Sequence, residues 1–144
     1  MSDAIWSLAA TAPSLPALLA HMRDHAYEVL QPLGIEVTFD TDPAVPALPL
    51  RVESRQALYL VFKEALHNVV KHAPAATDVR VRLTPAHPGL ALAVHNNGPA
   101  PANAALRPEG QGLSNMQARA AALGGTVQYP PQSTGFVVEL TLPG

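Results

Sequence analysis

Residues 51–72 restrict the fold of this chain more than any other segment, because their apolar residues recur at helical spacing. Pro74 follows the run and cannot continue a helix, so we expect a long helix from about Arg51 to His72. On that helix one arc is apolar, and it consists of Leu58, Tyr59, Phe62, Ala65, Leu66, Val69 and Val70. A helix with such a stripe is stable only when the stripe is buried against another element.

Two further segments show the same spacing. The first has Ser14 as a candidate N-cap, ends at Pro32 and Gly34, and carries the stripe Leu15, Leu18, Leu19, Met22, Ala26, Val29 and Leu30. The second covers residues 113–123, carries the stripe Leu113, Met116, Ala120 and Leu123, and is followed by two glycines. Three amphipathic helices are therefore predicted.

The remaining apolar segments alternate with a period of two and predict strands at 35–40, 78–83, 90–94, 126–129 and 136–142. The resulting order is α-β-α-β-β-loop-α-β-β. Because each helix has one apolar stripe, all three are expected to pack on a single sheet, which predicts a two-layer α/β sandwich.

Composition excludes several functional classes. A chain of 144 residues suits one domain, and the absence of cysteine rules out disulfides and thiolate metal sites. The net charge of -2 disfavours a nucleic-acid surface, and Arg80 and Arg82 alternate on one strand as on an ordinary solvated face. No apolar run approaches ~20 residues, so no membrane span is predicted.

The long helix carries polar groups on its front. With Glu64 set at zero, Asn68 falls at about +40°, Lys71 at about −20° and His72 at about +80°. A solvated outer face is the common explanation for such residues. The alternative is a phosphate site, because an amide oxygen suits Mg²⁺ and an ammonium suits phosphate.

Two loops could complete such a site. "GQGL", from Gly110 to Leu113, opens a helix, where glycines and free N–H groups favour a bound anion. "HNNG", from His95 to Gly98, ends a strand in a turn. Each signal is weak alone, but their order along the chain is specific.

With these motifs in place, the sequence resembles the ATP-binding domain of sensor histidine kinases, in the superfamily that includes gyrase, heat-shock chaperones and mismatch-repair ATPases. "EALHNVVKHA" is similar to the asparagine box of the nitrate- and membrane-fluidity-sensor sub-family. "HNNGPA" and "GQGLSNMQARAAALGGTV" are similar to the two glycine boxes. The resemblance covers nearly the whole chain and implies the Bergerat fold, with helices on one face of a mixed sheet.

The resemblance also implies roles for individual residues. Asn68 would hold Mg²⁺ between the phosphates of ATP, and Glu64 would support a metal-bound water or the proton transfer. Lys71 and His72 would face phosphates or ribose, residues 99–109 would form a lid, and the glycine boxes would contact nucleotide through Asn96, Gly98, Gly110, Gly112 and Leu113. The γ-phosphoryl would pass to a histidine on a dimerisation domain and from that histidine to a response regulator. The resemblance implies that the protein is cytoplasmic.

Residues 1–12 contain Trp6 and resemble the end of the helix that precedes this domain in such kinases, so the ATP-binding domain is expected at 13–144. The phosphoacceptor histidine would lie upstream of this chain.

Three residues depart from the family pattern. Asn96 stands where an aspartate usually accepts a hydrogen bond from the adenine amino group, Ala100 replaces a glycine, and Phe136 replaces a frequent threonine. We expect Asn96 still to accept through its carbonyl oxygen, with weaker ATP binding. An alternative is therefore a degenerate regulatory module with little or no ATP binding, and a third reading is a serine kinase of the anti-sigma-factor type.

His21 and His25 are one helical turn apart, a spacing compatible with a metal site. Since no third ligand is in view, we expect both on a solvated face. His95 is expected to be structural.

Overall fold

The computed structural model describes residues 14–73, 75–86, 89–98, 111–130 and 135–144. The helices are α2 (Leu15–Leu30), α3 (Val52–His72) and α4 (Gln111–Ala121), with 3₁₀ turns η1 (Gln31–Leu33) and η2 (Val45–Ala47). The strands are β1 (Glu36–Thr41), β2 (Asp78–Pro85), β3 (Leu90–Asn96), β4 (Thr126–Gln128) and β5 (Phe136–Leu142). This order and the predicted element types agree.

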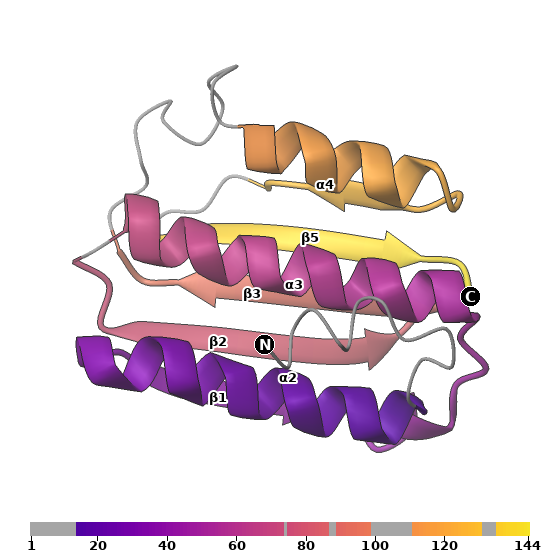
Figure 1. Cartoon of the computed structure of the whole chain (residues 1–144), viewed down its shortest axis with the longest axis horizontal. Coiled ribbons are helices and arrows are strands. Elements are labelled where there is room, and N and C mark those ends of the chain that lie inside the picture. The colour runs from indigo at the N-terminus through magenta and orange to yellow at the C-terminus, as the bar shows by residue number, and fades with distance from the viewer. Residues whose placement is uncertain (1–13, 74, 87–88, 99–110, 131–134) are drawn as a thin grey trace.

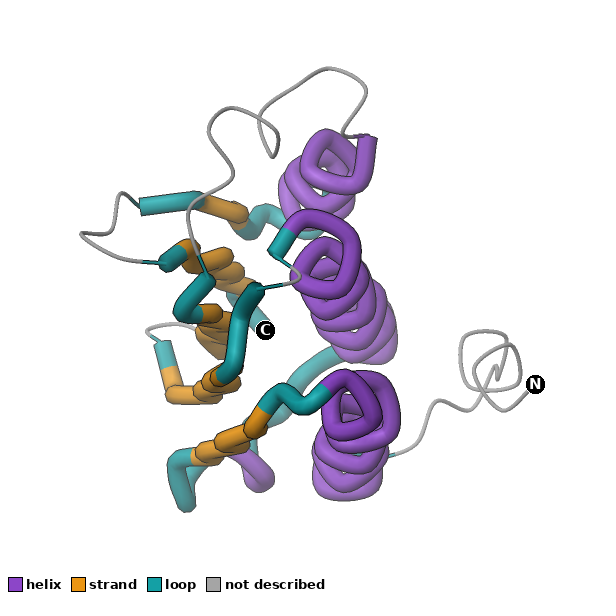
Figure 2. Tube along the Cα trace, turned by 90° about the vertical axis from the view of Figure 1, so that its left-hand side faces the viewer, coloured by secondary structure: helices purple, strands orange, loops and turns teal. Residues whose placement is uncertain are grey.

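The strands form one mixed sheet in the order β1-β2-β3-β5-β4. Only β1 and β2 run parallel, and the other three neighbouring pairs are antiparallel. All three helices cover the same face of this sheet, as Figures 1 and 2 show, with α2 over β1, α3 over β3 and β5, and α4 over β4 and β5. The predicted two-layer sandwich is confirmed.

The core lies between the two layers and contains most of the predicted stripe residues together with strand residues; Val29 and Leu123 are half-buried, and the side chain of Leu113 lies outside the described residues. On α3 the stripe is buried as expected except for Val70, which is half-buried. On α2 the Ser14 hydroxyl accepts a hydrogen bond from the N–H of Ala17 at 3.3 Å, so the predicted N-cap is confirmed. Within the described residues no helix has the length and apolar character needed to cross a membrane.

Ser54 in the first turn of α3 is completely buried and donates a hydrogen bond to the carbonyl oxygen of Gly144 at 2.5 Å. The same carbonyl accepts from Nε of Arg51 at 3.1 Å, at an exposed position. The start of α3 is thus joined to the residues that follow β5.

We predict that Ser54→Ala lowers the free energy of unfolding by about 1 kcal/mol, because it removes a buried hydrogen bond. Arg51→Ala is the matched control: it removes the exposed donor to the same carbonyl and should cost less than about 0.5 kcal/mol. Urea denaturation of both variants measures the difference. Equal effects would show that burial does not decide the strength of this contact.

Gly135 leads into β5 with a positive φ of 80°, and its backbone lies against the end of β3. A Cβ at this position would be 2.1 Å from the carbonyl oxygen of Asn96, which no packing tolerates. Gly34 has a similar φ of 77°, but a Cβ there would meet nothing within 4 Å.

The two glycines make a matched pair of tests. Gly34→Ala carries only the cost of left-handed backbone, about 1–2 kcal/mol of unfolding free energy. Gly135→Ala adds the collision with Asn96 and should cost about 2–5 kcal/mol in total. Thermal or urea denaturation compares them. If the two variants lose the same stability, the close approach of Gly135 to β3 is not as described.

Candidate nucleotide site

The ends of four secondary-structure elements lie at one edge of the domain. The last turn of α3, the end of β3, the start of α4 and the start of β5 all lie at the left of Figure 1. Antiparallel pairing explains half of this arrangement, because it places Asn96, the last residue of β3, directly opposite Phe136, the first residue of β5. Two of the three sequence motifs, the polar turns of α3 and the "HNNG" segment, therefore share an edge with the start of α4.

The polar residues predicted to form the site on α3 differ in how far their side chains are exposed to solvent. Glu64 and Asn68 are half-buried, and Lys71 is exposed. Asn68 is therefore accessible at the margin of the core, where a side chain is positioned by its neighbours and can still meet a ligand. The side chain of His72 lies outside the described residues.

The front of α3 also borders a groove of about 520 Å³ between α2 and α3. Its walls are His25, Val29, Leu60, Lys63, Glu64, Leu66, His67 and Val70. Glu64 is one of these residues, whereas Asn68 is not. The carboxylate and the amide predicted to act together thus lie at the border between this groove and the edge described above.

Asn96 is buried, with 4% of its surface exposed, and its side chain closes a turn. Its Oδ1 accepts a hydrogen bond from the N–H of Gly98 at 2.9 Å. The turn uses one of the two lone pairs of this oxygen, so acceptance from a base through the other stays a prediction. The sequence could have shown the bond within the turn, because an Asn side chain commonly bonds the N–H two residues later.

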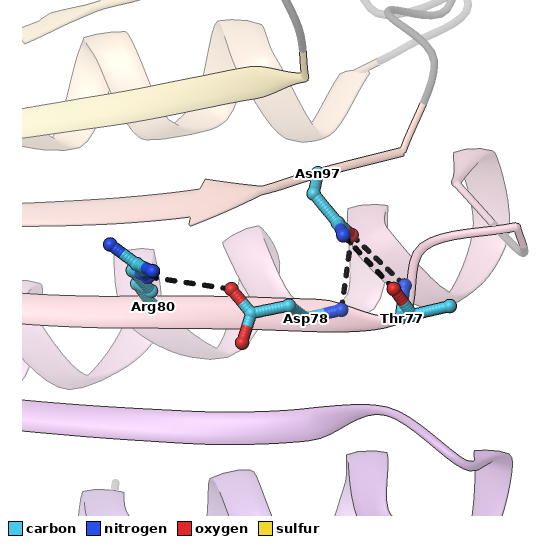
Figure 3. Close-up of polar contacts among 4 residues, drawn as sticks. All are labelled: Thr77, Asp78, Arg80 and Asn97. Atoms are coloured by element: carbon cyan, nitrogen blue, oxygen red, sulfur yellow. Dashed lines mark hydrogen bonds and ion pairs between the residues drawn. The ribbon is translucent and has the colours of Figure 1, made fainter.

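Asn97 follows the last residue of β3 and, unlike the buried Asn96, is exposed and bonds a neighbouring strand. Its Oδ1 accepts from the N–H groups of Thr77 and Asp78 at 2.9 and 3.0 Å, and its Nδ2 donates to the Thr77 hydroxyl at 2.9 Å (Figure 3). These bonds connect the end of β3 to the start of β2. We did not predict this contact from the sequence.

The same figure shows Arg80 beside Asp78, with Nε and Oδ2 3.4 Å apart. Arg80 and Arg82 are both exposed, as expected for a solvated face.

An aromatic pair flanks the turn. Phe136 is the strand neighbour of Asn96, and the ring of Tyr129 stacks on Phe136 with centroids 5.9 Å apart and planes inclined by 16°. Burial raises the pKa of Tyr129 to about 12, so its hydroxyl is neutral at physiological pH. The sequence indicated Phe136 as unusual but gave no reason to select Tyr129.

Helix α4 begins at Gln111, two residues before the predicted start, so Gly112 lies in its first turn together with Leu113. Leu113's side chain, Gly110, Ala100 and the predicted lid at 99–109 lie outside the described residues, as does the segment 1–12.

The histidines of α2 do not lie on a freely solvated face, and that prediction was wrong. Both are half-buried, His21 Nε2 lies 3.2 Å from the Tyr59 hydroxyl, and the His25 ring contacts the rings of Tyr59 and Phe62. They connect α2 to α3 by packing. Among the described residues no group of three His, Cys, Asp or Glu side chains is placed to hold a metal ion. His95 is half-buried on β3, and a Cβ at Gly135 would lie 3.0 Å from its Nε2.

Solved structures share this architecture. The chain aligns with the histidine kinase domain of the blue-light-activated kinase from Erythrobacter litoralis EL346 at 20% identity and a TM-score of 0.66, over 88% of this chain and 60% of that one. The nucleotide-free catalytic domain of the histidine kinase ThkA aligns at 19% identity and a TM-score of 0.70, over 91% and 92% of the two chains. The ATP-binding domain of PrrB from Mycobacterium tuberculosis aligns at 23% identity and a TM-score of 0.65, over 92% and 95%.

This chain spans less than two thirds of the Erythrobacter kinase structures, 60% of the kinase domain and 45% of the longer protein. A search of curated proteins finds no match. The sequence pattern described as "Histidine kinase-, DNA gyrase B-, and HSP90-like ATPase" matches residues 53–144, which is most of the chain. The chain therefore belongs to the histidine kinase-, DNA gyrase B- and HSP90-like ATPase family.

Proposed function

We propose that this chain is the ATP- and Mg²⁺-binding catalytic domain of a two-component sensor histidine kinase. The observation that carries the proposal is the meeting of the α3 polar turns, the β3 turn and the α4 start at one edge of the domain. These three elements hold the motifs of the asparagine box and the two glycine boxes, in a chain whose family binds ATP.

The donor set of this edge fits a magnesium ion that arrives with its nucleotide. Asn68 offers one hard amide oxygen at a partly exposed position. Mg²⁺ keeps several waters and takes phosphate oxygens as further ligands, so it needs only one or two protein groups. The lack of a three-residue metal cluster in the described residues agrees with such a site and argues against a dedicated metal cage.

The residues of the chain would act mainly by position and charge. Lys71, exposed at the end of α3, supplies a mobile positive charge for phosphate oxygens. Gly110, Gly112 and Leu113 would bring backbone N–H groups to the phosphates at the start of α4, with His72 nearby on α3. Glu64 would orient a water or accept a proton while the γ-phosphoryl passes to a histidine. Bound magnesium would neutralise charge on the phosphates.

The acceptor histidine would belong to a dimerisation domain, with residues 1–12 as the end of its helix and a response regulator as the later recipient. "EALHNVVKHA" favours the nitrate- and membrane-fluidity-sensor sub-family. We place the domain in the cytoplasm, where such kinases meet ATP.

A second candidate is a regulatory module that no longer uses ATP. The hydrogen bond from the Gly98 N–H to Asn96 Oδ1 favours it, because the turn shares the acceptor expected for adenine. Phe136 beside it also removes a hydroxyl that many relatives have.

We predict that Asn68→Ala weakens Mg²⁺-dependent nucleotide binding about tenfold or more, because it removes the protein's oxygen ligand to the metal. The matched control is His67→Ala, one residue away on the exposed surface of α3 and on the wall of the α2–α3 groove. Calorimetric titration with nucleoside triphosphates measures both variants.

Excess chelator should remove the difference between Asn68→Ala and the unmodified protein, since both then lack the metal. Equal loss in both variants, or an Asn68 effect that persists in chelator, would contradict the assigned role. Binding of no triphosphate by the unmodified protein at millimolar concentration would favour the regulatory module.

A further inference from the structure

We propose that the free edge of β1, together with the groove between β1 and α2, is a docking site for an extended segment of a partner protein in which basic and apolar side chains alternate. The segment would add to the sheet as a further strand beside β1. This inference does not depend on the proposed function, because none of the residues involved belongs to the candidate nucleotide site.

The backbone of β1 has one side without a partner in the described part of the chain. β1 is the first strand of the sheet order, lies at the lower edge of Figure 1, and pairs only with β2. The N–H of Glu36 donates to the Thr77 carbonyl at 2.9 Å, so Glu36 and every second residue after it face β2. The backbone groups of Val37, Phe39 and Thr41 therefore point to the free edge.

This edge lacks most of the features that block strand addition. β1 has six residues, contains no proline or lysine, and keeps an unbroken register with β2. Because Val37 is buried beside the helices, the exposed Glu36 and Asp40 lie on the open face of the sheet. Asp40 forms no ion pair with its described in-register neighbour, Arg82. Both carboxylates can therefore meet cations on an added strand.

The other side of an added strand would meet a groove of about 470 Å³ between α2 and the end of β1. Leu19, Ala20, Phe39 and Pro46 give this groove apolar surface, and Arg23 makes its wall basic. A strand edge beside such a groove is a common arrangement for binding extended peptides, because alternate side chains enter the groove. Apolar side chains suit the groove, whereas cations suit the open face.

The acids of β1 also disfavour a second copy of this chain as the occupant. Two β1 edges paired antiparallel about Phe39 would place Glu36 of each copy opposite Asp42 of the other. Like charges directly opposite each other destabilise a strand pair. A basic segment of another protein has the complementary charge.

The test is fluorescence anisotropy with the labelled peptide Lys-Val-Lys-Val-Lys-Val-Lys. Its isomer Lys-Lys-Lys-Lys-Val-Val-Val has the same charge without the alternation. The protein should bind the alternating peptide about tenfold or more tightly than the isomer. By NMR, the bound peptide should slow hydrogen exchange of the Phe39 and Thr41 N–H groups, which attraction between charges alone would not do.

Reversing the acids should reverse the preference. The double variant Glu36→Lys with Asp40→Lys should bind the alternating peptide about tenfold or more weakly, and should now bind Glu-Val-Glu-Val-Glu-Val-Glu. The matched control is Glu139→Lys, which reverses an exposed acid on β5 and should leave both affinities unchanged.

A second pair of variants tests the groove. Ala20→Lys places a cation in the groove and should weaken binding of the alternating peptide about tenfold. Ala17→Lys makes the same change at an exposed position of α2 that is not among the groove residues, and it should have no effect. Circular dichroism verifies that all variants are folded.

Four results would overturn the inference. These are no binding of the alternating peptide at millimolar concentration, equal binding of the two isomers, and equal loss in a variant and its matched control. The fourth is slowed exchange of the β1 edge amides in concentrated protein without peptide, which would make a second copy the occupant.

Discussion

Burial of the apolar arc of α3 against β3 and β5 is the constraint on which the rest of this structure depends. Phe62 of that arc is fully buried and meets the ring of Phe39 edge-on, with ring centroids 6.2 Å apart. With the arc fixed in the core, the rotation of α3 is fixed as well. This rotation places Asn68 and Glu64 at the margin of the core, where both are half-buried.

At the end of β3, the position of the backbone likewise determines the surroundings of two neighbouring side chains, Asn96 and Asn97. Asn96 is the last residue of β3 and is buried, whereas Asn97 follows the strand, is exposed and bonds residues at the start of β2. Asn97 fixes where β3 ends relative to β2, and Asn96 shapes the turn that follows. Of these two identical residues, Asn97 therefore connects two strands, and Asn96 is the candidate site residue.

Much of the fold was predictable, because the spacing of apolar residues and the positions of proline and glycine carry most of the necessary information. The three stripes and five alternating segments identified the α-helices and strands of the described residues but not the two 3₁₀ turns, and proline and glycine marked their ends to within a few residues. The contacts of His21 with Tyr59 and of Tyr129 with Phe136 were not predictable, since each joins residues from elements whose pairing only the folded chain defines. The bond from the Gly98 N–H to the Asn96 oxygen was not part of the sequence prediction, although it is a local contact within the chain's own turn.

The candidate site was predictable as a set of motifs, but the hydrogen bonds that its residues make within the chain were not. Residue type gives the inventory of donors and acceptors, whereas the turn decides which of them the backbone uses. Phe136 and Tyr129 add apolar walls, and a tyrosine hydroxyl that stays neutral adds no charge there.

The contact between Ser54 and Gly144 has a practical consequence for attaching a label or tether to this protein. The C-terminal residue lies at the right of Figure 1, at the end of α3 opposite the one that meets β3 and α4. The acceptor in this contact is a carbonyl, which survives when a peptide bond is added after it. A fluorescent reporter or surface tether joined after Gly144 would keep the carbonyl that Ser54 and Arg51 contact, and it would lie at the edge of the domain opposite the candidate nucleotide site.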